Sequence, residues 1–185
     1  MKRFLIPLLA TILMLSSCAT KQFDQNLSKG FDEAQTAFLE SAVVVDKTTR
    51  TWHRAIYDNY DHKGNYVSDF NTALYRLHNE LDEDGTFKEL ETLKKNLNDY
   101  AKALVNGPKS RKYAYDDFIV LVTDVNALLD LAIEPEGSLQ SYGSETKELA
   151  ASIKKEIDAF KLKYSDFLVE VVEDESNTTD EDEDW

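Results

Sequence analysis

Apolar residues recur at intervals of three and four along most of the chain after residue 30, which is the spacing of one face of an α-helix. The pattern runs through residues 31–60, 70–81, 87–104, 113–133 and 150–171. Polar stretches with glycine or proline separate these segments, at 61–65, 84–85, 106–108 and 135–137. Short polar connections between amphipathic helices favour antiparallel neighbours. The sequence therefore predicts an all-α fold, an antiparallel up-and-down helical bundle of four to five helices.

Two of these predicted helices carry start signals. Ser68 stands where a hydroxyl can cap the helix that begins near Phe70. Thr86 and Glu89 have the spacing of a capping box, in which two side chains bond to each other's backbone N–H. The segment 118–122 has the composition of a β-strand. Helical spacing persists over the longer frame, so we predict a helix there.

The first residues follow a different pattern. Lys2 and Arg3 precede an apolar run over residues 4–15, which is shorter than the roughly 20 residues that span a bilayer. A basic start, a short apolar run and then small residues are typical of a secretory signal peptide. The residues that follow, Leu15-Ser16-Ser17-Cys18, resemble the lipobox of bacterial lipoproteins.

This resemblance implies that residues 1–17 are a signal peptide, cleaved before Cys18. The sulfur of Cys18 then carries a diacylglyceryl group, with acyl chains such as palmitate, and attaches the protein to the membrane. A thiolate suits this role because it is the nucleophilic form of the side chain. Two or three acyl chains anchor a protein stably where one does not. The other interpretation is a secreted protein with a stray cysteine near its cleavage site.

The resemblance also implies a place in the cell envelope. Ala19, rather than aspartate, follows the cysteine. In a Gram-negative cell this implies the outer membrane, and in a Gram-positive cell the outer face of the plasma membrane. We expect a polar tether over residues 18–28, the bundle domain over 29–172 and a disordered acidic tail over 173–185.

The charge of the chain restricts its partners. The formal net charge is −14, and residues 173–185 hold eight acids and no Lys or Arg. Nucleic-acid binding depends on neutralising phosphates with basic side chains, so we expect no nucleic-acid partner. The same excess of acids argues against docking on anionic lipid headgroups beyond the anchor itself. Blocks of like charge repel themselves and stay disordered.

One acidic stretch between two predicted helices, residues 80–91, resembles the calcium loop of the EF-hand. Calcium prefers such a density of oxygen ligands. The stretch departs from the pattern at its first position, where aspartate is expected, and at Lys88, which adds a positive charge. The alternative is an acidic helix end, a turn and a new helix. The candidate ligands are Glu80, Asp82, Asp84, Thr86 and Glu91.

Other chemical candidates are weaker. The histidines are His53, His62 and His78, of which His62 has two aspartates nearby, a weak metal site or an ordinary surface group. Trp52, with Tyr57 and Tyr60, could line an aromatic pocket or belong to the core. The sequence has no Gly-x-Ser-x-Gly motif and no thiol besides Cys18. We therefore expect no enzymatic activity.

Three short segments resemble recurring parts of small helical bacterial lipoproteins of unknown function. They are Trp52-x-x-Ala55-Ile56, Asp69-Phe70-Asn71-x-Ala73-Leu74 and Pro135-x-Gly137-Ser138-Leu139. The expected function is that of a non-enzymatic, lipid-anchored envelope protein that acts through contacts with another, unidentified envelope protein. The alternative is an envelope module that binds a small ligand or calcium.

Overall fold

The computed structural model describes residues 5–166 and 168, with side chains from residue 19 onward, and confirms the predicted all-α bundle. Its elements are α1 (Leu5–Tyr57), α2 (Phe70–Glu83), α3 (Thr86–Leu104), the 3-10 turn η1 (Lys109–Arg111), α4 (Lys112–Ile133) and α5 (Leu139–Tyr164). None of the described helices combines the length and the apolar character needed to cross a bilayer. The predicted acidic tail, residues 173–185, lies outside the described part of the chain.

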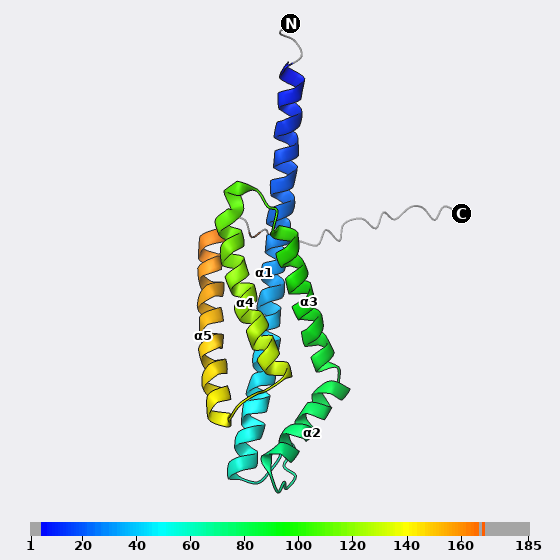
Figure 1. Ribbon diagram of the computed structural model, residues 1–185, viewed down its shortest axis with the longest axis vertical. Helices are drawn as coiled ribbons and strands as arrows, with labels where there is room; N and C mark the ends of the chain where they lie inside the picture. Colours follow the sequence, from blue (N-terminus) through cyan, green and yellow to red (C-terminus); the bar gives the residue numbers. More distant parts are fainter. Residues whose placement is uncertain (1–4, 167, 169–185) are drawn as a thin grey trace, which may run out of the picture.

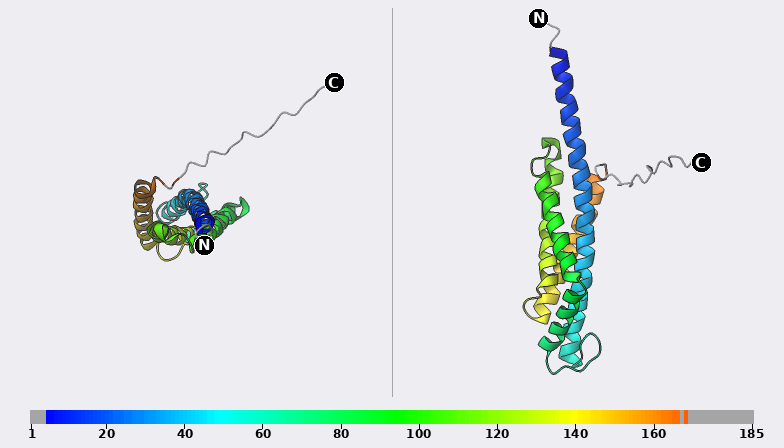
Figure 2. Two further views of the ribbon diagram at one scale, coloured as in Figure 1. Left: turned by 90° about the horizontal axis from the view of Figure 1, so that it is seen from above. Right: turned by 90° about the vertical axis from the view of Figure 1, so that its right-hand side faces the viewer.

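Helix α1 is the long axis of the molecule (Figure 1). It packs against α2, α3, α4 and α5, and α4 also packs against α3 and α5. Helices α2 and α3 run in the same direction, one above the other, and together they take one place in the antiparallel bundle with α1, α4 and α5 (Figures 1 and 2). At its N-terminal end α1 extends beyond the other helices. The opposite end, where α1 turns into α2, is called the distal end below.

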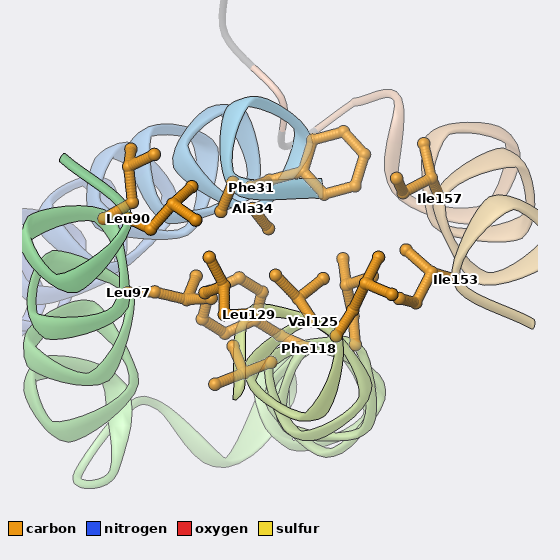
Figure 3. Packing of buried hydrophobic residues seen from close by; sticks show 14 of the residues in the cluster. Phe31, Ala34, Leu90, Leu97, Phe118, Val125, Leu129, Ile153 and Ile157 are labelled. Carbon is orange, nitrogen blue, oxygen red and sulfur yellow. The ribbon is translucent and has the colours of Figure 1, made fainter. Parts of the chain in front are cut away.

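The core lies where α1, α3, α4 and α5 face one another (Figure 3). Phe31 of α1 stacks on Phe160 of α5, with ring centroids 4.8 Å apart. Buried leucines, valines and isoleucines from α3, α4 and α5 fill the space between the helices. Burial of apolar surface is the main favourable term in folding, so this shared core holds the helices together.

Gly30 allows α1 to approach its neighbours closely. A Cβ added at Gly30 would lie 2.8 Å from the ring of Phe118 in α4 and 3.0 Å from Cβ of Tyr100 in α3. Any larger residue would therefore force α1 away from both helices. Glycine lowers the helix propensity at this position, but it allows three helices to come into close contact.

The predicted tether over residues 18–28 is wrong. These residues belong to α1, and Phe23 and Leu27 are buried in the core. Phe23, Leu27 and Phe31 are four residues apart and so lie on one helix face. The apolar stripe therefore begins earlier than residue 29, among polar neighbours that conceal it.

The helix starts also differ from the prediction. Asp69, not Ser68, caps α2 by accepting a hydrogen bond from the Thr72 backbone N–H at 2.9 Å. The predicted capping box at α3 is wrong, because the Thr86 hydroxyl donates backward to the Asp84 carboxylate. Helix α5 begins at Leu139, well before the predicted residue 150, because Ser138 supplies a cap there.

A candidate interaction surface at the distal end

Large apolar side chains are exposed where α1 ends and the connection to α2 begins. We call this group the distal tip, and it comprises Ile56, Tyr57, Tyr60, Tyr66 and Phe70. Tyr57 and Tyr66 are 66% and 68% exposed. Exposed apolar side chains scattered singly are normal in soluble proteins. Five within 15 residues of sequence make this end a candidate interaction surface.

The tip is exposed because α2 covers a different side of α1. Ala55 of α1 is buried with Val67 and Ala73 in a small apolar cluster. Ile56 and Tyr60, which the spacing of the stripe predicts to be core, point instead to solvent. The helix ends at Tyr57, so Tyr60 no longer follows the helical period.

The connection is a compact hairpin. Tyr60 and Tyr66 face each other across an isolated antiparallel bridge, with their rings edge to face at 6.4 Å. The Val67 N–H donates to the Asn59 carbonyl at 2.9 Å, and Asn59 has a positive φ of 63°. Gly64, at φ 84°, closes the turn in a region that glycine adopts without strain. Edge-to-face rings are a favoured aromatic geometry, so the hairpin holds both tyrosines in place.

Buried Asp61 organises this hairpin. Its carboxylate accepts hydrogen bonds from the backbone N–H groups of Lys63 at 3.0 Å and Asn65 at 2.8 Å. It also accepts from the Asn65 amide at 3.1 Å and from the Arg76 guanidinium of α2 at 2.9 Å. Burial by itself raises the pKa of a carboxyl, but these donors outweigh it and hold the pKa of Asp61 well below its usual range.

A second carboxylate, Glu80, joins α2 to the connection and to α1. It accepts from Lys63 at 2.5 Å, from His62 at 2.8 Å and from Lys47 at 3.1 Å. Hydrogen bonds from Lys63, and to a lesser extent from His62 and Lys47, lower the pKa of Glu80 to about 2. Glu80 is therefore neutralised by cationic side chains of α1 and of the connection.

The predicted aromatic pocket is divided between core and surface. Trp52 is buried, with Phe70 and Tyr142 each at 5.9 Å between ring centroids. Tyr57 lies on the outside against His53, with ring centroids 4.5 Å apart. Trp52 is thus the internal support on which Phe70 rests, while Tyr57 and Tyr60 belong to the tip.

The candidate calcium ligands do not form a loop. Glu80 and Asp82 lie in α2, and Glu91 lies in α3, so that Asp84 and Gly85 alone separate the two helices. Residues two apart on a helix point about 200° away from each other, so Glu80 and Asp82 face opposite sides. The Asp84 carboxylate accepts from Thr86, and Glu80 is bound by Lys47, His62 and Lys63. This arrangement favours the alternative of an acidic helix end and a turn.

The three histidines have separate surroundings. His53 contacts Tyr57, His78 contacts Phe87 and His62 contacts Glu80. The carboxylate oxygens of Asp61, the neighbour of His62, accept hydrogen bonds from the hairpin backbone and from Arg76. Within the residues the structure describes, no group of three or more His, Cys, Asp or Glu side chains could hold a metal ion.

Sequence reasoning missed the roles of Asp61, Arg76 and Tyr66. A usable signal was present, because three tyrosines stand among turn-forming residues at 57–66. Aromatic residues in a polar turn do not belong to the buried face of a helix, so their exposure could have been expected.

In comparisons with protein-family models, curated proteins and solved structures, nothing matches this chain. The resemblance to small helical lipoproteins therefore stays a prediction. In the structure, Trp52, Ala55 and Ala73 from those segments are buried, and Gly137 precedes the Ser138 cap at a positive φ of 87°.

Proposed function

We propose that this protein is a non-enzymatic, lipid-anchored protein of the bacterial cell envelope that binds another envelope protein through its distal tip. The observation that carries the proposal is the group of exposed aromatic side chains on and beside a hydrogen-bonded hairpin. Tyrosine is enriched in the energetically important centres of protein interfaces. Because the hairpin is already ordered, little conformational entropy is lost when a partner binds.

The exposure of the tip favours a protein partner over a small ligand. Small-molecule sites are concave and bury most of the ligand surface among apolar side chains. Tyr57 and Tyr66 are instead about two-thirds exposed to solvent. The calcium alternative has less support, because the oxygens of Glu80 are already bound to cationic side chains.

The position of Cys18 suits this role. The lipobox-like residues predict attachment at Cys18, which belongs to α1, the helix whose N-terminal end extends beyond the other helices (Figure 1). Cys18 and Tyr57 are 39 positions apart in one helix, which is about 60 Å at roughly 1.5 Å per residue. A lipid at Cys18 therefore puts the membrane at one end of the molecule and the tip at the other.

The anchor is tested by the substitution Cys18→Ser. We expect the precursor to keep its signal peptide and the protein to lose labelling by a palmitate analogue. Maturation and membrane retention that remain unchanged in this variant would contradict the lipid anchor.

The tip is tested by site-specific photo-crosslinking in intact cells. A photoreactive residue at Ser68, beside the tip, is compared with one at exposed Lys95, halfway along α3. We expect a discrete heavier adduct from position 68 and none of the same mass from position 95. An identical pattern from both positions, or no adduct from either, would refute the tip as the contact surface.

A further inference from the structure

The N-terminal end of the bundle exposes a second surface, of a different kind. From Tyr100 to Tyr115 the sequence holds four basic residues and no acid, in a chain of net charge −14. This stretch includes the connection from α3 to α4, which lies at the end where α1 protrudes (Figures 1 and 2). We call residues 102–113 the basic foot. Its cations are Lys102, Lys109, Arg111 and Lys112.

Two contacts fix the foot to the beginning of the mature helix. Gly107 lies directly against Phe23, since an added Cβ would come within 2.2 Å of its ring. The Arg111 guanidinium donates to both oxygens of Asp24, at 2.8 and 2.9 Å. Phe23 follows Cys18 by five residues, or about 8 Å along the helix axis. Gly107 and Arg111 are therefore held beside the part of α1 that begins about one and a half turns after the proposed lipid attachment.

We infer that the basic foot docks on the anionic phospholipid headgroups of the membrane that holds Cys18. This inference rests on the lipid anchor proposed above, because the anchor brings the foot to the bilayer surface. Each Lys or Arg near an anionic leaflet contributes about 1 kcal/mol of attraction. The foot is thus a second attachment of the same molecule beside its acyl chains.

The apolar side chains of the foot fit the same partner. Tyr113 is 76% exposed and Val105 is 56% exposed, both among the lysines. Tyrosine has an apolar body and a polar end, and lysine can lay its stem on apolar surface while its ammonium group reaches out. This combination is the one found where proteins meet lipid headgroups.

The acidic residues that pair with the cations of the foot differ in their burial. Asp24 and Arg111 form a pair that is mostly buried, at 17% and 20% side-chain exposure. This pair serves to position the connection. The pairs Lys102–Asp99 and Lys112–Asp116 are largely exposed. Exposed pairs contribute little to stability, so both lysines can turn toward phosphates, together with Lys109.

This arrangement changes the expectation drawn from net charge. The sum over the whole chain argues against docking on headgroups, but eight of its acids follow residue 172 and the foot carries none between Tyr100 and Tyr115. A flexible lipid anchor alone lets a rod tilt freely. Docking of the foot restricts the tilt and directs the distal tip away from the bilayer.

The inference is tested with the lipidated protein in vesicles of phosphatidylcholine, with or without phosphatidylglycerol. Because Cys18 is blocked by lipid, the substitution Ser110→Cys gives one site in the foot for a fluorophore. A spin label on the lipid headgroups quenches fluorophores that come near. We expect at least twofold stronger quenching with phosphatidylglycerol, reduced by high salt, and no such difference for a fluorophore placed by Ser68→Cys.

Charge reversal provides the matched comparison. In a variant with Lys102→Glu, Lys109→Glu and Lys112→Glu we expect quenching to fall to the level in phosphatidylcholine. The control reverses three exposed lysines of α5: Lys147, Lys154 and Lys155. Circular dichroism checks that both variants are folded, and quenching of the control should match the wild type.

The outcomes separate the two proposals. A protein that does not float with vesicles at all contradicts the lipid on Cys18. A protein that floats, but whose quenching is the same with and without phosphatidylglycerol, contradicts the foot and leaves the anchor standing. Equal quenching of the foot variant and the wild type would also overturn the inference.

Discussion

The two ends of the bundle handle charge in opposite ways. At the distal end the carboxylates of Asp61 and Glu80 are bound by several donors each, and aromatic rings are exposed. At the other end one mostly buried pair, Asp24 with Arg111, fixes the connection, and lysines are exposed.

Under the two proposals made above, the two ends of this bundle have separate tasks. The centres of protein interfaces are depleted of charged residues, so pairing the charges inside the hairpin leaves the tip suited to an apolar contact. A headgroup layer instead attracts exposed cations. Substitutions at each end test whether the two ends are independent.

The largest effect is expected from Asp61→Ala. The substitution leaves the backbone N–H groups of Lys63 and Asn65 without their buried acceptor and removes the partner of Arg76. Unsatisfied buried donors cost about 1–3 kcal/mol each, so we expect the free energy of unfolding to fall by about 3–4 kcal/mol. Urea unfolding measures the change, with Trp52 as the fluorescent reporter in a Trp185→Phe background.

The matched control is Asp58→Ala, an exposed aspartate three residues earlier. Its effect should stay within about 0.5 kcal/mol, as for surface substitutions in general. If Asp58→Ala and Asp61→Ala were equally destabilising, the hairpin would not depend on the buried carboxylate.

Acid provides the next test, because it should weaken the distal end. The pKa of Glu80 is about 2 in the folded protein, against 4.5 in the unfolded chain, and that of Asp61 is also lowered. A lowered pKa stabilises the fold above the unfolded value, and this stability is lost as the pH falls through the folded value. For Glu80 the loss between about pH 5 and pH 2 amounts to at most about 3.5 kcal/mol, at roughly 1.4 kcal/mol per unit.

Thermal unfolding of the wild type and Glu80→Gln measures this loss. We expect the wild type to be more stable at neutral pH and the difference to shrink steadily as the pH is lowered to about 2. A difference that is constant over this range would show that the ion pairs of Glu80 do not hold the hairpin to α1 and α2.

Two glycines test the packing of the helices between the two ends. In Gly30→Ala the new Cβ meets Phe118 and Tyr100, so we expect a loss of about 1–2 kcal/mol. In Gly143→Ala, on α5, nothing lies within 4 Å, and the better helix former should add about 0.5–1 kcal/mol. Melting temperatures that move in the same direction would contradict the close approach of α1 to α3 and α4.

The bundle could be predicted from sequence because its helices obey one rule. Apolar residues at intervals of three and four mark the buried face, as at Leu90, Leu93 and Leu97 of α3, all of which are buried. The rule failed where buried and exposed residues alternate among polar ones. Phe23 and Leu27 were assigned to a tether because Asp24, Gln25 and Asn26 between them conceal the stripe.

The candidate site was harder to predict because it depends on contacts between distant residues. The spacing places Ile56 in the core, and only the path of α2 shows that it is exposed. Likewise the pairing of Asp61 with Arg76 joins residues 15 positions apart. The acidic run at residues 80–84 looked like a metal loop because sequence shows acids but not the cations that neutralise them, Lys47 and Lys63.

The smallest effects on stability, and the sharpest comparison of the ends, come from two exposed tyrosines, Tyr66 of the tip and Tyr113 of the foot. Each substitution to serine should change the free energy of unfolding by less than about 1 kcal/mol, because both rings are mostly exposed. Tyr66→Ser should weaken the crosslinked adduct from position 68 by about tenfold, since central tyrosines of interfaces commonly contribute more than 1 kcal/mol. Tyr113→Ser should lower headgroup quenching and leave that adduct intact. If either substitution impaired both readouts equally, the two surfaces would be parts of one function rather than two independent attachments.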